Sequence, residues 1–478
     1  MNQIPTLQSF IAGQWIGSTA ANPLASAVNG KLVYHTHAET IDFEQSLDFA
    51  RRAGQQSLLA MDFQSRAACL RALGKYLIEH KETLYTISTH SGATRADSWI
   101  DIEGGAGTLF AYASLGRREL PSGNLIPEDD VIPLGPTGAF AGGHILVPRR
   151  GVTVHINAFN FPVWGMLEKF APNFLAGMPC IVKPGSSTSY VTEAAVRLMQ
   201  QSGLLPEGSL QLVIGRTGDL LDRLGGQDIV TFTGSAATAA KLRVTPNLVA
   251  NSVMFNAEAD SLNCAILAPD VTPDDAEFDL FVKEVVREMT TKAGQKCTAI
   301  RRVLVPADKV DAVTEKLIAR LAKTRVGDPA IEGVRMGALA SHDQQRDVHH
   351  QVEALMTSCE RVYGGTADFS PLGEGASNGA FFEPTLLLCR DPDAEGGAHD
   401  IEAFGPVSTL MPYRDIDHAI ELAARGKGSL VSSVITRSPE LAARIVPAIA
   451  SWHGRVHILD AEAATESTGH GSPLPMLK

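Results

Sequence analysis

The sequence predicts an α/β fold with two domains, each built on a parallel β-sheet covered by helices, and a small β extension. In two regions, 151–255 and about 259–453, short apolar segments alternate with segments of helical periodicity, which is typical of parallel strands joined by crossover helices. The chain of 478 residues is too long for one ordinary core. Between 120 and 150, prolines and glycines separate short strand-like runs, which predicts an extended hairpin.

The elements follow in chain order. A surface strand is expected at 9–17, and helices are expected at about 42–62, 64–80 and 97–116, although the glycines of 103–107 favour a break in the third helix. The first alternating region predicts strands at 151–157, 180–182, 210–214 and 229–232, and helices at about 163–177, 190–202 and 218–224. The second predicts strands near 262–267, 301–305, 385–388, 407–411 and 429–436, and helices near 276–291, 308–323, 346–356, 416–425 and 438–449.

The composition is that of a globular protein, with 44% hydrophobic and 20% charged residues. A formal net charge of −12 without a block of lysine or arginine argues against nucleic acid and anionic membranes as partners. Six cysteines without CxxC or CxxxC spacing indicate neither a metal site nor a disulfide framework. The N-terminus lacks a basic segment followed by an apolar one, and no apolar run is long enough to span a bilayer. These features predict a cytoplasmic protein.

The stretch from Thr291 to Ala299 is the strongest local candidate for a catalytic site. A helical pattern leads up to it, Gly294 stands where that helix is expected to stop, and a strand follows at 301–305. Cys297 is therefore expected on a tight turn beside Lys296, where a cation or an amide dipole favours the thiolate. Considered alone, a single cysteine is more often a small buried apolar residue.

Two further patterns follow predicted strands. In the segment 157–162, Asn160 could donate its side-chain amide to an oxyanion, with the backbone N–H of Cys297 as the second donor, or it could cap the following helix. Lys183 stands at the carboxyl end of a strand, where it could bind a ribose or phosphate oxygen, or could be a solvated surface residue.

Three more patterns concern a diphosphate and a general base. The segment Phe232 to Ser235 leads from a strand into a helix and could present backbone amides to a diphosphate, or Ser235 could be an ordinary N-cap. No GxGxxG motif occurs, and Gly215 to Gly218 is only a weak substitute. Glu258, expected at the join of the two domains, could act as a general base, although most glutamates are simply solvated.

Taken together, these patterns resemble the aldehyde dehydrogenase superfamily over nearly the whole chain. The matching features, in the family's order, are 160–162, 183–184, 232–235, Glu258, 294–297 and 402–407. The resemblance implies a thioester mechanism with Cys297 as nucleophile, Asn160 as oxyanion donor and Glu258 as the base that activates water. It also implies a nicotinamide cofactor and no metal. The residues expected to bind the cofactor are Asn157, Ala158, Phe159, Lys183, Gly185, Ser186, Gly215, Gly218, Phe232, Thr233, Gly234, Ser235, Glu402 and Phe404.

The resemblance also suggests a division of the chain. We expect 1–119 and 151–257 to form an NAD(P)-binding domain and 258–455 to form the catalytic domain. We expect 120–150 and 456–478 to be oligomerisation or bridging segments, so that the protein is a homo-oligomer.

One branch of the family is more similar than the rest. The segments 91–98, 154–160, 258–263 and 286–290 resemble enzymes of aerobic phenylacetate and benzoyl-CoA breakdown, which oxidise a CoA-linked semialdehyde released by ring opening. The implied substrate is 3-oxo-5,6-dehydrosuberyl-CoA semialdehyde; the benzoyl-CoA pathway semialdehyde and a general aldehyde are the alternatives. The segment 466–475 also resembles the phenylacetate enzyme, in which a hydratase-like domain follows. The chain is then either part of a longer protein or a single-function homologue.

Two departures from the family pattern are informative. Ala259 to Ser261 stand where the wider family has a leucine and two glycines, so the backbone after Glu258 is expected to differ. Ser186 stands where many NAD-using relatives carry a glutamate that binds the adenosine ribose. Because serine removes a charge that would repel a 2′-phosphate, NADP is the expected cofactor, with NAD possible.

Two other functions are compatible with a reactive cysteine. One is a cysteine hydrolase that acts on thioesters without a cofactor, and the other is a scaffold that keeps the fold without activity. Binding of NADP discriminates the first alternative from a dehydrogenase, and turnover discriminates the second.

Overall fold

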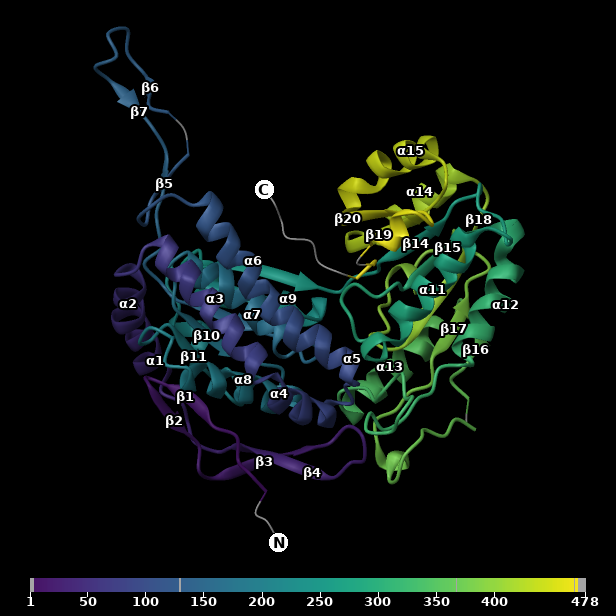
Figure 1. Cartoon of the computed structure of the whole chain (residues 1–478), viewed down its shortest axis with the longest axis horizontal. Coiled ribbons are helices and arrows are strands. Elements are labelled where there is room, and N and C mark those ends of the chain that lie inside the picture. Colours follow the sequence, from purple (N-terminus) through teal and green to yellow (C-terminus); the bar gives the residue numbers. More distant parts are fainter. Residues whose placement is uncertain (1–3, 129, 367, 468, 472–478) are drawn as a thin grey trace. The chain divides into compact units, whose positions relative to one another are not determined.

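The computed structural model describes residues 4–471 apart from residues 129, 367 and 468. Its chain forms two compact units (Figure 1). The N-terminal unit comprises Met1–Leu24, Leu32–Ser88 and Ser98–Ala259, and the C-terminal unit comprises Ala25–Lys31, Thr89–Asp97 and Asp260–Lys478. Each unit contains a seven-stranded, largely parallel sheet. The predicted fold class, two parallel-sheet α/β domains with a small β extension, is confirmed.

The sheet of the N-terminal unit has the order β13-β12-β9-β10-β11-β1-β2. Five neighbouring strands, β13 to β11 in that order, are parallel, and β1 and β2 add an antiparallel hairpin at the other edge. The strands are β1 (Ser9–Ile11), β2 (Gln14–Ile16), β9 (Thr153–Ile156), β10 (Cys180–Lys183), β11 (Leu210–Leu212), β12 (Ile229–Gly234) and β13 (Met254–Ala259).

Helices cover both faces of this sheet. Alternate residues of β10 enter different cores: Cys180 and Val182 pack with α3, α6, α7 and α8, whereas Ile181 packs with α1 and the segments after β11 and β12. Figure 1 shows α3, α6 and α7 side by side on the first face. The helices of this unit are α1 (Phe43–Phe49), α2 (Gln55–Leu59), α3 (Phe63–Glu79), α4 (Lys81–Ser88), α6 (Gly104–Glu119), α7 (Trp164–Leu175), α8 (Ser189–Gln201), α9 (Ala236–Arg243) and α10 (Pro246–Ala250).

The C-terminal unit repeats this architecture with the strand order β16-β17-β18-β15-β14-β19-β20. Six strands are parallel, and only β16 at the edge is antiparallel. The strands are β14 (Cys264–Leu267), β15 (Arg302–Pro306), β16 (Glu360–Tyr363), β17 (Thr385–Leu388), β18 (Val407–Tyr413), β19 (Ser429–Ile435) and β20 (His453–Leu459). The helices are α11 (Ala276–Thr290), α12 (Val310–Leu321), α13 (His342–Leu355), α14 (Ile416–Ala424) and α15 (Pro439–Ile449).

The segment 120–150 forms the predicted hairpin. Strand β5 (Ile126–Pro127) pairs with β8 (Ile145–Leu146), and β6 (Ile132–Pro133) pairs with β7 (Ala141–Gly142), all antiparallel. In Figure 1 this hairpin extends away from the helices of the N-terminal unit. Its exposed large apolar side chains are Leu125, Val131, Ile132, Leu134, Phe140, Ile145, Leu146 and Val147.

Several elements differ from the sequence prediction. The glycine-rich stretch at 103–107 does not break the helix, because α5 (Arg95–Ser98), the π-helical turn Trp99–Glu103 and α6 follow one another without a gap. A side chain on Gly104 or Gly105 would lie about 3.0–3.1 Å from Trp164, so these glycines allow close packing of α6 on α7. The two-stranded sheet of β3 (Ala20–Ala25) and β4 (Leu32–His37) was not predicted either.

The predicted division of the chain also differs from the observed units in detail. The short segments Ala25–Lys31 and Thr89–Asp97 belong to the C-terminal unit, where the Ala27 N–H donates to the His90 carbonyl and the Ala27 carbonyl accepts from Ala380. Strand β20 pairs with β19 in the C-terminal sheet, although 456–478 was expected to be a bridging segment. Residues 472–478 of that segment lie outside the described residues.

Candidate functional site

The backbone turns left-handed immediately before Cys297. Helix α11 ends at Thr290, and the 3₁₀ turn Thr291–Gly294 follows. Lys292, Ala293 and Gly294 have φ values of 52°, 51° and 67°. Gly294 is the predicted helix stop, but the two preceding residues carry side chains in a conformation that costs free energy and persists only when the surroundings enforce it.

The segment Ser91 to Asp97 supplies part of that enforcement. The backbone N–H of Lys292 donates to Asp97 Oδ1 at 2.7 Å, and Lys292 Nζ donates to Ser91 Oγ at 3.0 Å. Gln295 Nε2 donates to the Lys292 carbonyl at 2.9 Å, while Gln295 Oε1 accepts from the Ala340 N–H at 2.9 Å. All of these residues belong to the C-terminal unit and are buried.

Arg301 also holds this turn. Its guanidinium donates to the Gly294 carbonyl at 2.8 Å and to the Gly405 carbonyl at 2.7 Å, and its Nε lies 3.4 Å from Glu402 Oε1. A Cβ on Gly294 would lie 2.1 Å from the Gly405 oxygen, so no side chain fits there. The ring of Phe404 lies against the Arg301 guanidinium, 5.4 Å from centroid to Cζ.

The charge balance around Arg301 and Glu402 is set by burial. Burial lowers the pKa of Arg301, while Glu402 and, more weakly, the Cys297 thiol oppose that change. Burial likewise raises the pKa of Glu402 against the effect of Arg301. Arg301 is therefore a cation close enough to Cys297 for the two groups to interact electrostatically.

Lys296 does not present a free cation to the thiol. Its Nζ donates to both carboxylate oxygens of Glu288, at 2.8 and 2.7 Å, and both side chains are buried. Burial alone would raise the pKa of Glu288, but the effects of Lys296, His470 and Arg287 together outweigh it and the pKa is lowered. The effect of Lys296 on the thiolate is therefore weaker than the sequence predicted, because Glu288 balances the charge of Lys296.

Asn263 fixes the cysteine's own backbone. Its Nδ2 donates to the Cys297 carbonyl at 2.8 Å and to the Ala299 carbonyl at 3.0 Å. Its Oδ1 accepts from Ser261 Oγ at 2.8 Å and from the Val431 N–H at 3.0 Å. Both polar atoms of this fully buried amide are therefore satisfied, which holds the turn at one position relative to the sheet.

In the N-terminal unit, the predicted cofactor segments end level with one another. Lys183 and Phe232 both pair with Ile156, and Thr233 pairs with Glu258. Because the strands are parallel, the segments that follow β9, β10 and β12, and Glu258 near the end of β13, lie at the same edge of the sheet. This is the edge at which parallel α/β sheets bind ligands.

The helix-capping alternative for Asn160 is wrong. Helix α7 has Val163 as its N-cap and receives no side-chain hydrogen bond from that residue. The backbone N–H groups of Val163 and Trp164 instead donate to Asp101 Oδ1, at 3.0 and 2.8 Å. Asn160 is buried, in the loop that precedes this helix.

Asn157 presents unsatisfied polar atoms at this edge. Within the described part of the chain, neither its side-chain nitrogen nor its side-chain oxygen has a hydrogen-bond partner, although the residue is buried. The hydroxyls of Thr231 and Thr233 are also buried and without a partner there. Unpaired buried polar groups are costly, so a polar ligand or a water that bonds to them is favoured here.

The turns after β9 and β10 pack in close contact. A Cβ on Gly185 would lie 2.8 Å from the backbone nitrogen and Cα of Phe159, so only glycine allows this approach. Lys183 is half-buried, which lowers its pKa, and its Nζ donates to the Pro184 carbonyl at 2.9 Å. It is not the solvated surface lysine of the alternative interpretation. Ser186 is exposed at the start of the turn Ser186–Thr188.

Three further cofactor candidates lie in the segments that follow β11 and β12. Ser235 is the N-cap of α9, and its side chain accepts from the Thr238 N–H, so the capping interpretation is confirmed. Gly215 and Gly218 have φ values of 107° and 48° in the loop after β11. A Cβ on Gly218 would lie 2.9 Å from the Phe43 ring.

Glu258 has a charged neighbour that the sequence did not indicate. Glu168, on α7, has its pKa raised by burial and, to a smaller extent, by the Glu258 carboxylate, while Lys169 opposes this. Lys169 Nζ lies 3.1 Å from Glu168 Oε1. Glu168 and Glu258 are near each other because α7 packs against the sheet that contains β13. No local sequence pattern predicts this.

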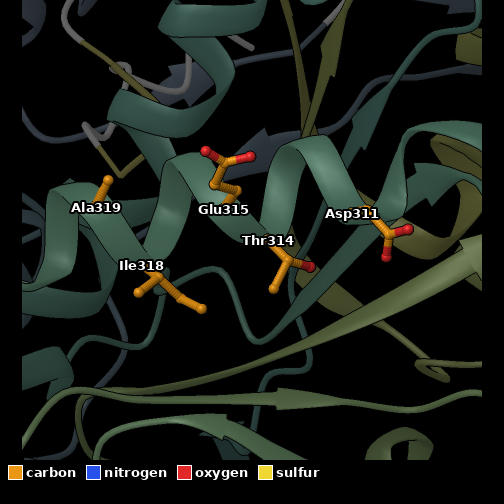
Figure 2. Close-up of a pocket in the computed structure, with 5 residues that line it drawn as sticks. All are labelled: Asp311, Thr314, Glu315, Ile318 and Ala319. Carbon is orange, nitrogen blue, oxygen red and sulfur yellow. The ribbon is translucent and has the colours of Figure 1, made fainter.

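A hollow on the surface of α12 is unrelated to these residues. It is lined by Asp311, Thr314, Glu315, Ile318 and Ala319, all from this one helix (Figure 2). None of the predicted site residues lines it. Between residues 4 and 471, no helix combines the length and apolar character needed to cross a membrane, leaving aside the three undescribed positions.

Comparison with known proteins identifies the family. The profile of the Aldehyde dehydrogenase family matches residues 15–471. The chain is 44% identical over 471 residues, 98% of its length and 91% of the relative's, to a 3,4-dehydroadipyl-CoA semialdehyde dehydrogenase of Aromatoleum evansii. A shorter match, 50% identical over 143 residues, covers 30% of this chain and 41% of Protein MaoC of Klebsiella aerogenes.

Solved structures agree on the fold. A betaine aldehyde dehydrogenase of Staphylococcus aureus in complex with NAD⁺ has a TM-score of 0.81 at 24% identity, covering 95% of this chain and 86% of that one. A second structure, of a putative aldehyde dehydrogenase from Burkholderia cenocepacia, has a TM-score of 0.82 at 23% identity and covers 95% and 89% of the two chains. With the profile and the identity across nearly its whole length, these likenesses show that the chain is an oxidoreductase of the aldehyde dehydrogenase family.

Proposed function

We propose that the protein oxidises a CoA-linked semialdehyde to the carboxylate, with NADP as the preferred cofactor and a thioester on Cys297 as the intermediate. The observation that carries the chemistry is the turn around Cys297: Asp97 and Arg301 hold the left-handed backbone before it, and Asn263 holds the Cys297 carbonyl. Such rigid support is what a positioned nucleophile requires. The CoA-linked substrate is supported by the 44% identity to a 3,4-dehydroadipyl-CoA semialdehyde dehydrogenase. Within this class, 3-oxo-5,6-dehydrosuberyl-CoA semialdehyde is our specific candidate.

The proposed roles follow from the residues present. The Cys297 thiolate attacks the aldehyde carbon, and the Asn160 amide and the Cys297 N–H stabilise the oxyanion. The hydrogen on that carbon leaves as hydride, and the acyl group remains on sulfur as a thioester. Glu258 removes a proton from water, which attacks the thioester carbon; the carboxylate product and the thiolate are then released.

The described residues fit a nicotinamide dinucleotide. Asn157, Thr231 and Thr233 have buried polar atoms without protein partners in the described chain, and Gly185 lets the turn after β10 pack on the backbone of Phe159. We propose that Lys183, Ser186 and the backbone from Gly234 to Ser235 hold the ribose and phosphate groups, with Gly215 and Gly218 in the adjacent loop. Glu402 and Phe404 are proposed to bind the nicotinamide end. When bound, the cofactor accepts the hydride.

The test is a panel of aldehydes assayed with NADP and with NAD. It contains a short aliphatic aldehyde, an aromatic aldehyde and a CoA-linked semialdehyde. We expect the highest kcat/KM for the CoA-linked substrate with NADP. Equal activity toward the free aldehydes would contradict the substrate assignment, and thioester hydrolysis without a cofactor would contradict the reaction itself.

Replacing Glu258 by glutamine is expected to separate the two half-reactions. Without the carboxylate base, thioester hydrolysis should slow by roughly 10²-fold or more, whereas hydride transfer should change far less. Stopped-flow absorbance should then show a burst of reduced cofactor followed by a slow steady rate. Equal loss of burst and steady rate would contradict the proposed role. Glu315→Gln, on an exposed face of α12, is the matched control.

Replacing Ser186 by glutamate is expected to shift the cofactor preference from NADP toward NAD. A carboxylate there would repel a 2′-phosphate, and a loss of about 1.4 kcal/mol already weakens NADP tenfold. We expect at least that tenfold change in the ratio of kcat/KM values. Ser187→Glu introduces the same charge one residue later and serves as the control. An unchanged ratio in Ser186→Glu would show that Ser186 does not set the preference.

We further propose that the protein is a homo-oligomer whose subunits meet at the 120–150 hairpin. The support is the row of exposed apolar side chains on that hairpin, since large exposed apolar patches mark interaction surfaces. Replacing Val131 and Phe140 by serine should lower the molecular mass measured in solution. We also propose that the protein associates with a hydratase domain; the support is the match to part of Protein MaoC.

A further inference from the structure

Two cysteines outside the proposed catalytic residues face each other across a pair of strands. Strand β16 pairs with β17 in antiparallel register, Arg361 opposite Leu387 and Glu360 opposite Leu388. Continued by one residue past the ends of both strands, this register places Cys359 opposite Cys389. Opposed residues of antiparallel strands have Cα atoms about 4.5–5.5 Å apart. A disulfide spans Cα separations of about 4.4–6.8 Å, so this register is compatible with one.

The two thiols influence each other's ionisation. The neighbouring Cys389 lowers the pKa of Cys359 to about 7, against the effect of burial, and the Ser358 hydroxyl contributes. The neighbouring Cys359, together with burial, raises the pKa of Cys389, whose Sγ donates to the Asp391 carbonyl at 3.4 Å. The pair therefore consists of a more acidic and a less acidic thiol, which suits an attacking and a resolving cysteine.

Two cysteines outside the pair differ from it. Burial raises the pKa of the partly buried Cys69 to about 11, and it also raises the pKa of the buried Cys180. Neither of them has a second cysteine as a partner in the described residues. Cys180, which is also buried, and the partly buried Cys69 are therefore control cysteines that lack the pairing.

The pair lies directly beneath the surface. Cys359 is 7% exposed and Cys389 is 4% exposed. Their sequence neighbours Ser358, Glu360 and Arg390 are all exposed. Cys359 lies in the short connection between α13 and β16, so a small oxidant needs only a local opening of that connection to reach its sulfur.

We propose that Cys359 and Cys389 form a reversible disulfide when the enzyme is exposed to a hydroperoxide. The Cys359 thiolate attacks one oxygen of hydrogen peroxide, the O–O bond breaks, and Cys359 sulfenic acid forms; the departing hydroxide takes a proton from the solvent and becomes water. The Cys389 sulfur then attacks the Cys359 sulfur, the S–O bond breaks, and the hydroxyl leaves with the Cys389 proton as a second water. Two thiols are oxidised and one hydrogen peroxide is reduced. A dithiol reductant reverses the bond by thiol–disulfide exchange.

The disulfide would join the connection after α13 to the end of β17. Helix α13 contacts the segment that supports the Cys297 turn: Gln344 Nε2 donates to the Phe404 carbonyl at 2.7 Å, and Val348 packs against Gly405. Because a disulfide restricts the unfolded chain, oxidation of the pair is expected to raise the apparent Tm by a few degrees.

The test uses the full chain with Cys297→Ser, so that oxidation of the proposed nucleophile does not interfere. The protein is treated with hydrogen peroxide, alkylated and digested, and the peptides are mapped by mass spectrometry. We expect a Cys359–Cys389 linked peptide that disappears after dithiothreitol, with the loss of two alkylatable thiols. Cys69→Ser and Cys180→Ser should leave its yield unchanged.

Single replacements of the pair distinguish the order of the steps. In Cys389→Ser, Cys359 should stop at the sulfenic acid and be labelled by dimedone, whereas in Cys359→Ser little label should reach Cys389. If both thiols remain fully alkylatable at peroxide levels that inactivate the wild type, the proposal is overturned. Linkage of either cysteine to Cys69, Cys180 or Cys264 would overturn it as well.

Two further measurements support the test. Circular dichroism of each variant checks that the variant is folded. Binding of phenylarsine oxide to the untreated protein independently reports that the two thiols are adjacent.

Discussion

Replacing Cys297 by alanine is expected to abolish aldehyde-dependent reduction of the cofactor. Removal of a covalent nucleophile leaves no route to the thioester, so kcat should fall by roughly 10⁴-fold or more. The measurement is the initial rate of reduced-cofactor formation with the CoA-linked semialdehyde, followed by absorbance. The fold should persist, because the turn is held mainly by Asp97, Arg301 and Asn263.

Cys69→Ala is the control for this variant. Cys69 is a partly buried cysteine of the N-terminal unit, and burial raises its pKa to about 11. Its replacement should leave the rate within a factor of about two. Appreciable oxidation by Cys297→Ala would assign the chemistry to another group.

Replacing Glu288 by glutamine is expected to give the largest loss of stability among the site variants. The buried Lys296 ammonium would lose the carboxylate that balances its charge, and breaking such a pair from one side costs about 3–5 kcal/mol. The apparent midpoint of urea or thermal unfolding should fall accordingly. Because Lys296 precedes Cys297 directly, kcat should fall as well.

Two comparisons test the cause of that loss. Adding Lys296→Met to Glu288→Gln removes the unpaired charge and should recover most of the stability, whereas an additive loss would contradict the account. The pKa of Glu288 is lowered from its ordinary value of 4.5, so its contribution is fully present above that pH and is lost as pH falls through the lower folded value. The difference in stability between wild type and Glu288→Gln should therefore shrink at strongly acidic pH.

Most of the fold could be predicted because its signals are local. The helix expected at 276–291 is α11, Ala276–Thr290, and Gly294 is left-handed as expected of a helix stop. Strands β13 and β20 were missed because edge strands need not be apolar throughout. In β13, Asn256 and Glu258 interrupt the apolar residues, and in β20 the first residues are His453 and Gly454.

The support of the proposed site could not be predicted in the same way. Asp97 and Lys292 are 195 residues apart in the chain, and Arg301 and Gly405 are 104 residues apart. Asp97, Lys292 and Arg301 each look like an ordinary charged residue in the local sequence, and only the tertiary fold shows that they are buried. Lys292 in a left-handed conformation has no sequence signal at all, since that conformation is rare for a lysine.

The central claim is that the acyl group is carried by the Cys297 sulfur. The most direct test mixes Glu258→Gln with NADP and the CoA-linked semialdehyde, quenches in acid after the burst, and maps the peptides by mass spectrometry. We predict that the Cys297 peptide carries the mass of the acyl group, and that hydroxylamine removes it. A full burst of reduced cofactor without an adduct on Cys297, or with the acyl group on another residue, would contradict the account.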